Sequence, residues 1–284
     1  MPEGDSVYQL SKRLQFMTGR EVTASSLRVP RFATVDFTGM TVERVWPYGK
    51  HLFMQFGAAG HDAQILHTHL KMEGTWAFHR AGQRWRKPGH AARVVLSLAD
   101  APAPDIELVG FWLGLVRVFP AREYGEQMGY LGPDLLAEHF DAAEAVRRIE
   151  ARPDMEIGRA LLDQRNLAGI GNVYRVETLF MTRTNPWARV DSLPEGKLRE
   201  IVTLAHKLLH LNKDRSMRST VGQAPQGRPL FWAYGKDGQP CRRCGTQLKR
   251  GEIDDALLTV DPAPSRTAVQ HLRKIVWCPR CQSE

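Results

Sequence analysis

The sequence lacks several features that would place it in a special class of protein. Its longest nearly apolar run, residues 108–116, has nine residues and includes two glycines, whereas a membrane-spanning helix needs about 20 apolar residues. The first residues are acidic and have no apolar core, so we expect neither a secretory signal nor a transit peptide. We therefore expect a cytoplasmic protein. Clustered Asp and Glu residues, which would hold the open metal site of a hydrolytic nuclease, are also missing.

Cysteine is scarce, but its placement is informative. All four cysteines lie in the last 44 residues as two Cys-x-x-Cys pairs, Cys241 with Cys244 and Cys278 with Cys281. Two such pairs supply four thiolates for one tetrahedral zinc ion, and four protein ligands leave no position for a reacting water. The sequence therefore predicts one structural zinc ion, with an inserted loop at residues 254–265. Disulfides are the alternative, which the absence of an export signal disfavours.

Acidic residues are outnumbered by basic ones. The 39 Lys and Arg residues exceed the 31 Asp and Glu residues by eight, and residues 213–250 contain nine basic and only two acidic side chains. A polyanion such as nucleic acid is the natural partner, because neutralised phosphates release condensed counterions. A solvated basic face is the alternative.

The first part of the chain is rich in short β-like segments. Apolar or alternating runs between turn residues predict strands at residues 40–45, 51–56, 64–70, 92–98 and 106–119. These strands indicate a β-sandwich or a barrel. A helix precedes them, because Asp5 or Ser6 can cap an amphipathic segment that ends near Gly19.

Helical periodicity replaces alternation further along the chain. It predicts helices at residues 142–150, 156–164, 173–181 and 194–211. Ser192 and Glu195 form a capping box before the last of them. The fold class is therefore α+β and multidomain. We expect a β-sandwich domain over residues 1–119, a linker over 120–133, a helical domain over 134–235 and a zinc finger with an insertion over 236–284.

Two glycines connect the second and third predicted helices. Gly169 and Gly171 allow the backbone to approach a ligand closely, and the amide groups that open the next helix suit a phosphate. An ordinary turn between helices would also explain both glycines.

Four motifs occur in order along the chain: Pro2-Glu3-Gly4, the turn at residues 48–52, the segment at residues 169–174, and the closing four-cysteine finger. Together they resemble the bacterial formamidopyrimidine-DNA glycosylase and endonuclease VIII family of base-excision repair enzymes. The resemblance covers essentially the whole chain. It implies an N-terminal β-sandwich with flanking helices, a helix-two-turn-helix DNA-binding domain, a zinc finger, and a bifunctional DNA glycosylase and AP lyase.

The resemblance implies that catalysis begins at Pro2. Removal of Met1 would free the nitrogen of Pro2. An α-amino group titrates at about 7.7 to 8.0, so a fraction of this amine is unprotonated at neutral pH. Such an amine can attack C1′ of a damaged nucleotide, form a Schiff base and lead to β,δ-elimination. Glu3 would act as general acid and base, and Lys50 would contact a phosphate or the sugar. Without the resemblance, Glu3 is an exposed helix-start carboxylate and Lys50 a solvated turn lysine.

Three further positions match residues that contact DNA in the family. Asn172 corresponds to a phosphate-binding asparagine and Arg273 to the zinc-finger arginine, with Arg266 and Lys274 as alternatives because of the insertion. Met72 matches the side chain that fills the gap left by an extruded nucleotide. An apolar strand residue that faces the core is the other interpretation of Met72.

Two departures from the family pattern narrow the expected substrate. Ser6 stands where many members carry a glutamate, and residues 110–114 lack the Asp-Pro-Arg-Arg-Phe-Gly pattern of the branch that excises 8-oxoguanine. We therefore expect the endonuclease VIII branch and oxidised pyrimidines, in double-stranded DNA or in single-stranded or bubble DNA. The protein would be a monomer in the bacterial cytoplasm, associated with the nucleoid and with no membrane partner. A non-catalytic zinc-finger protein that recognises damaged or abasic DNA is the alternative.

Overall fold

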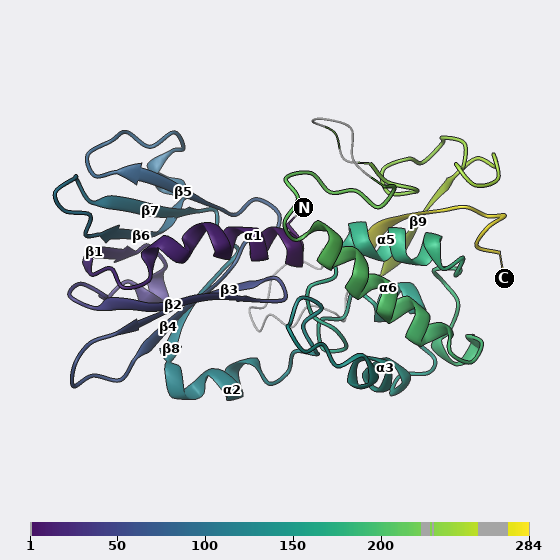
Figure 1. The fold of residues 1–284 in the computed structure, drawn as a ribbon, viewed down its shortest axis with the longest axis horizontal. Helices are drawn as coiled ribbons and strands as arrows, with labels where there is room; N and C mark the ends of the chain where they lie inside the picture. Colours follow the sequence, from purple (N-terminus) through teal and green to yellow (C-terminus); the bar gives the residue numbers. More distant parts are fainter. Residues whose placement is uncertain (1, 223–227, 229, 255–271, 284) are drawn as a thin grey trace. The chain divides into compact units, whose positions relative to one another are not determined.

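The computed structural model describes residues 2–222, 228, 230–254 and 272–283. The chain divides into two compact units, unit 1 (Met1–Gly129) and unit 2 (Tyr130–Glu284) (Figure 1). The division falls within the stretch predicted as a linker, which also contains the short helix α2 (Tyr124–Met128). Most of the predicted inserted loop, and Arg266, lie outside the described residues. In the described part of the chain, no helix is long and apolar enough to cross a membrane.

Unit 1 is a sandwich of two four-stranded antiparallel sheets, as predicted. One sheet has the strand order β1-β6-β7-β5 and the other β2-β3-β4-β8. The strands are β1 (Val22–Leu27), β2 (Thr41–Tyr48), β3 (His51–Gly57), β4 (Gln64–His69), β5 (Thr75–Arg80), β6 (Ala92–Leu98), β7 (Ile106–Phe111) and β8 (Leu115–Pro120).

One strand prediction was wrong and two strands were not predicted. The segment at residues 106–119 is not one strand, because the chain turns between β7 and β8 at Trp112, whose φ is +46°. A bulky residue rarely adopts this conformation, so Trp112 itself does not mark the turn in the sequence. Strands β1 and β5 were not predicted; β1 has only two large apolar residues, Val22 and Leu27, one at each end.

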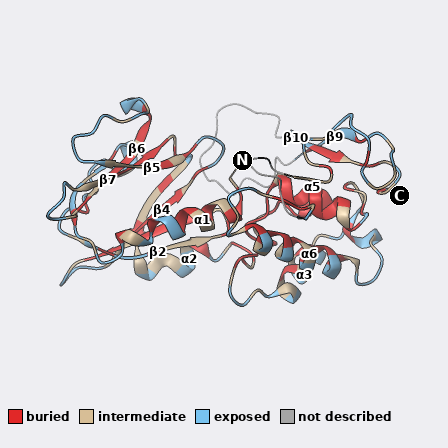
Figure 2. Cartoon of the chain, turned by 45° about the horizontal axis from the view of Figure 1, so that its top comes forward, coloured by how far each residue is buried: buried red, intermediate tan, exposed pale blue. Residues whose placement is uncertain are grey.

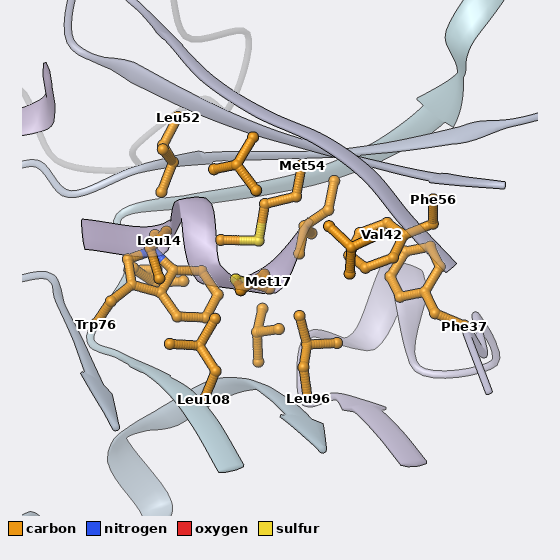
Figure 3. Packing of buried hydrophobic residues seen from close by; sticks show 14 of the residues in the cluster. Leu14, Met17, Phe37, Val42, Leu52, Met54, Phe56, Trp76, Leu96 and Leu108 are labelled. Carbon is orange, nitrogen blue, oxygen red and sulfur yellow. The ribbon is translucent and has the colours of Figure 1, made fainter. Parts of the chain in front are cut away.

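The core of unit 1 lies between the sheets and around helix α1 (Gly4–Leu14) (Figure 3). Leu14 and Met17 of the N-terminal segment pack with side chains of both sheets, including Met54 and Leu96. Burial of each such side chain contributes about 1.5–3 kcal/mol. The helix begins two or three residues earlier than predicted, since its N-cap is Glu3 rather than Asp5 or Ser6.

Unit 2 begins with four helices: α3 (Ala142–Glu150), α4 (Ile157–Ala160), α5 (Asn172–Met181) and α6 (Lys197–Asn212). Helix α4 is shorter than predicted, because the side chain of Asp163 accepts hydrogen bonds from the backbone and guanidinium of Arg165 and stabilises a turn. The predicted capping box is also wrong. Ser192 belongs to a separate 3₁₀ turn, and α6 starts after Gly196, whose φ is +75°.

The C-terminal hairpin of β9 (Lys249–Asp254) and β10 (Leu272–Trp277) belongs to the same compact unit as these helices. Trp277 contacts Trp187 with ring centroids 4.6 Å apart, and a Cβ at Gly251 would lie 2.7 Å from the Trp187 ring. Gln282 donates a hydrogen bond to the carbonyl of Thr184, which follows α5. Helix α5 is buried along most of its length (Figure 2).

Candidate functional site

Strand register places three connections of unit 1 at one end, which we call the loop end. His51 at the start of β3 pairs with His69 at the end of β4, and His69 pairs with Leu115 at the start of β8. This end of unit 1 therefore contains the β2–β3 turn with Lys50, the β4–β5 loop with Met72 and the β7–β8 turn. Helix α1 also starts at this end of unit 1 (Figure 1).

The start of α1 carries Pro2 and Glu3. Glu3 is extended, with φ −123° and ψ −174°, and its carbonyl accepts hydrogen bonds from the amides of Ser6 and Val7 at 3.0 and 3.2 Å. Its side chain is fully buried, which excludes an exposed helix-start carboxylate, while Pro2 is half-buried. Asp5 is a second buried carboxylate here, which the motifs did not single out. The positive end of the α1 dipole is thus close to the Pro2 nitrogen.

Lys50 lies in a tight two-residue turn. Tyr48 and His51 pair across the turn, and Gly49 has a φ of +56°, a conformation that glycine adopts at little cost. Lys50 is half-buried rather than fully solvated.

Three histidines of β3 and β4 form what we call the histidine cluster: His51, His67 and His69. The Nδ1 of His51 and the Nε2 of His67 are 2.8 Å apart, and the rings of His51 and His69 are edge-on at 4.9 Å. Burial, followed by the charges of Lys50 and Lys71, lowers the pKa of His51 to about 3. Burial likewise lowers the pKa of His67 and of His69 well below 6.5. Sequence reasoning missed this cluster, although His67 and His69 lie two residues apart in a predicted strand and therefore share one of its faces.

Met72 occupies the loop between β4 and β5, so it does not face the core. Its side chain is 65% exposed, the largest exposure among the large apolar residues of the described chain. An exposed methionine at a loop tip is free to enter an apolar space on a partner.

In unit 2, the two glycines and Asn172 are brought together before α5. Gly169 has a φ of +105°, and its amide donates to Gln164 Oε1 at 3.0 Å. Gly171 is the N-cap of α5 and has an extended backbone. Asn172 is the first residue of the helix, where backbone amides suit an anion.

Asn172 also connects α5 to the hairpin. Its Nδ2 donates to the carbonyl of Lys274 at 3.0 Å, which places it next to Arg273 on β10. Its Oδ1 accepts from Nε and Nη2 of the fully buried Arg175, at 3.1 and 2.6 Å. Arg273 is exposed on the hairpin. Sequence reasoning did not identify Arg175.

A buried carboxylate holds the chain that follows α6. Glu177 of α5 accepts hydrogen bonds from the hydroxyl of Thr220 and from the amides of Trp232, Ala233 and Tyr234, the three amides at 2.8 Å. It is fully buried. No motif marked it, because its partners lie more than 40 residues away.

The four cysteines fit a metal ion. The sulfurs of Cys241, Cys244, Cys278 and Cys281 all lie within 4.8 Å of one another, and those of Cys244 and Cys278 are 3.5 Å apart. A tetrahedral ion with sulfur at about 2.3 Å separates its ligands by just under 4 Å. Burial, and then the neighbouring thiols, raise the pKa of Cys281 to about 12, whereas hydrogen bonds with Thr246 lower that of Cys244 to about 6. A bound cation would relieve the repulsion among four thiolates.

Two family models match the chain. The formamidopyrimidine-DNA glycosylase N-terminal domain matches residues 1–107, and the formamidopyrimidine-DNA glycosylase H2TH domain matches residues 131–219.

Curated relatives match over the full length. "Probable endonuclease 8 2" of Streptomyces coelicolor is 42% identical over 100% of this chain and 94% of its own. "Endonuclease 8 2" of Mycobacterium tuberculosis is 40% identical over 99% and 100%. "DNA-(apurinic or apyrimidinic site) lyase Nei2" of Mycolicibacterium smegmatis is 38% identical over 100% and 99%.

Solved structures support the fold. The Lactococcus lactis Fpg (MutM) in complex with an N7-benzyl-Fapy-dG DNA has a TM-score of 0.77 and 20% identity, with full coverage of both chains. Full-length identity near 40% to the curated relatives goes further than fold. The chain belongs to the formamidopyrimidine-DNA glycosylase and endonuclease VIII family of DNA repair enzymes.

Proposed function

We propose that this chain removes oxidised pyrimidines from DNA and cuts the strand at the resulting abasic site, with the Pro2 nitrogen as nucleophile. The start of α1 carries the proposal: Pro2 directly precedes a helix whose N-cap, Glu3, is a buried carboxylate. The relatives named endonuclease 8 and DNA-(apurinic or apyrimidinic site) lyase support the same chemistry.

The reaction begins once Met1 has been removed. The lone pair of the Pro2 nitrogen forms a bond to C1′ of the damaged nucleotide, and the bond from C1′ to the base breaks. The base leaves with the electron pair of the broken bond and takes up a proton. The sugar ring opens to give an iminium ion. Loss of a proton from C2′ then expels the 3′ phosphate, and loss of a proton from C4′ expels the 5′ phosphate. Hydrolysis of the iminium ion frees the enzyme.

Glu3 and Lys50 assist these steps in the proposal. The carboxyl group of Glu3 donates a proton to the opening ring oxygen and later accepts one, as general acid and base. The ammonium group of Lys50, held in a tight turn at the loop end, contacts the sugar or a phosphate beside the lesion. The α1 dipole disfavours the protonated form of the Pro2 amine.

Unit 2 supplies the phosphate contacts. Gly169 and Gly171 let the backbone come close to a phosphate, and Asn172 and Arg273 offer hydrogen-bond donors on neighbouring elements. One zinc ion on the four cysteines would be structural, because all four positions around it are taken by protein sulfur.

The lesion and its context extend the proposal. Met72 fills the gap in the duplex when the damaged nucleotide is extruded, and single-stranded or bubble DNA is a second substrate because it needs no such filling. The proposed division of the chain is a catalytic domain at residues 1–119, a linker at 120–133, a helix-two-turn-helix domain at 134–235 and a zinc finger at 236–284. We place the protein as a monomer on the bacterial nucleoid.

Borohydride trapping tests the mechanism. Wild-type protein incubated with an abasic-site duplex and borohydride should yield a covalent adduct, and peptide mapping should assign it to Pro2. Pro2→Gly should trap far more slowly, and Glu3→Gln should bind the duplex but release few damaged bases. Binding without any adduct would identify a non-catalytic DNA-binding protein, and an adduct on Lys50 would refute Pro2 as the nucleophile.

A panel of duplexes tests the substrate. Thymine glycol and dihydrouracil should be released at least tenfold faster than 8-oxoguanine at equal enzyme concentration, a difference of about 1.4 kcal/mol in the barrier. The reverse order would refute the preference for oxidised pyrimidines.

A further inference from the structure

The connection between β5 and β6 is fixed on the outer face of its sheet. Val95 of β6, and Val109 and Phe111 of β7, belong to a small apolar cluster separate from the main core. Trp85 of the connection packs on this cluster, with its ring centroid 5.7 Å from that of Phe111. Its indole N–H donates a hydrogen bond to the carboxylate of Glu107. A large aromatic side chain therefore anchors the connection to the strands beneath it.

Exposure alternates along residues 83–89 of this connection, which we call the basic segment. Trp85 and Lys87 are half-buried, whereas Arg84 and Arg86 are exposed. Such alternation is expected of an extended chain with one face on the protein, and it places the two arginines about 7 Å apart on the other face. The segment also lines an open hollow of about 550 Å³. Both guanidinium groups are thus available to a ligand.

A third arginine adds to this positive surface. Arg28, which follows β1, lies over the Trp85 ring at 5.2 Å and donates to the carbonyl of Gly89 at 3.3 Å. Among the residues that the structure describes, no carboxylate forms an ion pair with Arg28, Arg84 or Arg86. Clustered cations without an acidic partner create a positive potential that attracts a polyanion.

The basic segment reaches the loop end of unit 1. The Nζ of Lys87 donates to the hydroxyl of Thr75, the first residue of β5, at 2.5 Å. It also lies 5.0 Å from the ring centroid of Trp112, in the β7–β8 turn. From Lys87 back to Arg84 an extended chain covers about 10 Å, the length of about three base pairs of DNA. The positive surface therefore begins at the loop end and continues away from it.

We propose that Arg84 and Arg86, together with Arg28, bind backbone phosphates of the duplex beside the lesion and form a second DNA-contact surface in unit 1. The inference rests on the proposed function, which places the damaged nucleotide at the loop end. Continuity with that end favours DNA over an acidic peptide as the occupant. Phosphate contacts of this kind are independent of base sequence, and their contribution to affinity falls as the salt concentration rises.

Three double variants separate charge at this surface from charge in general. Arg84→Gln with Arg86→Gln removes both charges from exposed side chains. Arg84→Lys with Arg86→Lys keeps the charges, since an ammonium group also neutralises a phosphate. Arg44→Gln with Arg122→Gln is the matched control. Both of these residues are exposed, and they lie toward the opposite end of unit 1, where Arg44 pairs with Gln55 and Arg122 follows β8.

The first assay measures equilibrium binding to a lesion duplex that carries a non-cleavable tetrahydrofuran abasic analogue. The slope of log affinity against log salt concentration should be smaller by about 1.8 for Arg84→Gln with Arg86→Gln, at about 0.9 for each lost phosphate contact. Between 50 and 200 mM salt, wild-type affinity should therefore fall about twelvefold more than the affinity of this variant. The lysine variant and the matched control should keep the wild-type slope.

A second assay locates the contacts. Single backbone phosphates are replaced in turn by a neutral methylphosphonate, and replacement at flanking positions should weaken wild-type binding. At the positions that Arg84 and Arg86 contact, replacement should have no further effect on the glutamine variant.

Three outcomes would overturn the inference: a wild-type salt slope in the glutamine variant, an equal change in the matched control, or a flanking scan that is the same in variant and wild type. Binding of a polyglutamate peptide that needs both arginines, with an unchanged slope on DNA, would assign the surface to a protein partner and would also overturn it. A wild-type chain that binds no lesion duplex would instead refute the proposed function.

Discussion

Acidification should destabilise unit 1 through the histidine cluster. His51 and His67 are buried in adjacent strands and share a short contact between ring nitrogens. Burial is the largest cause of the lowered pKa of each, and the nearby cations Lys50, Lys71 and Arg117 add to it for His51. Both rings are therefore neutral in the folded protein over the range in which free histidine titrates.

The sign and size of the effect follow from this difference. Below pH 6.5 the unfolded chain binds protons that the folded chain does not, so the free energy of unfolding falls as the pH falls. The stability is fully present above pH 6.5 and is lost progressively toward the folded pKa of His51, about 3. At pH 5, His51 alone lowers the free energy of unfolding by about 2 kcal/mol, at about 1.4 kcal/mol per pH unit below 6.5. His67 acts in the same direction. The free energy of unfolding of a whole domain is only about 5–15 kcal/mol, so the loss is a substantial part of it.

Urea titrations at pH 7 and pH 5 measure this loss. Pulsed hydrogen exchange, read by mass spectrometry on peptides of β3 and β4, reports unit 1 separately from unit 2. His67→Phe, whose ring can stack on Phe53 as His67 does at 4.6 Å, should show a clearly smaller loss between the two pH values. His61→Asn, a change at an exposed histidine, should match wild type. Identical losses in wild type and His67→Phe would show that the buried rings do not carry the effect.

Three shorter predictions concern unit 2. Removal by a chelator of the metal ion proposed on the four cysteines, or Cys278→Ser, should lower DNA affinity and expose β9 and β10 to hydrogen exchange while β3 stays protected; unchanged affinity would contradict a structural metal. Glu177→Ala should cost about 3 kcal/mol or more in urea unfolding, because three amides lose a charged acceptor. Gly132→Ala should cost about 1–3 kcal/mol, because its Cβ would meet the backbone of Asn166; a neutral result there would show that the chain relaxes around the methyl group.

Local signals explain which elements could be predicted. Helix α3 has the predicted bounds because Asp141 caps it, accepting the amide of Glu144 at 2.8 Å. Strand β6 also matches its prediction, since it is centred on the apolar, partly β-branched run of residues 94–96. The cysteines were found from spacing alone. In each case the information lies within a few neighbouring residues.

The missed features depend on contacts between distant residues. The histidine cluster exists because the pairing of β3 with β4 places His51 opposite His69. Which residues pair across two strands cannot be read directly from the sequence. Glu177 satisfies amides of residues 232–234. Sequence motifs therefore supplied the residues proposed for the chemistry, whereas the residues that hold them in place were found only in the structure.

Arg175 shows how such a supporting residue ties two predicted features together. Because its guanidinium occupies Oδ1 of Asn172 and also donates to the carbonyl of Gly158 at 3.1 Å, the amide group of Asn172 must direct Nδ2 away from α5. Asparagine is thereby fixed as a donor, the polarity that a phosphate requires. That donor also bonds to Lys274 of β10, the strand that leads into Cys278. The orientation of Asn172 thus depends on the hairpin that the cysteines hold, so the four-cysteine site and the proposed phosphate contact are not independent.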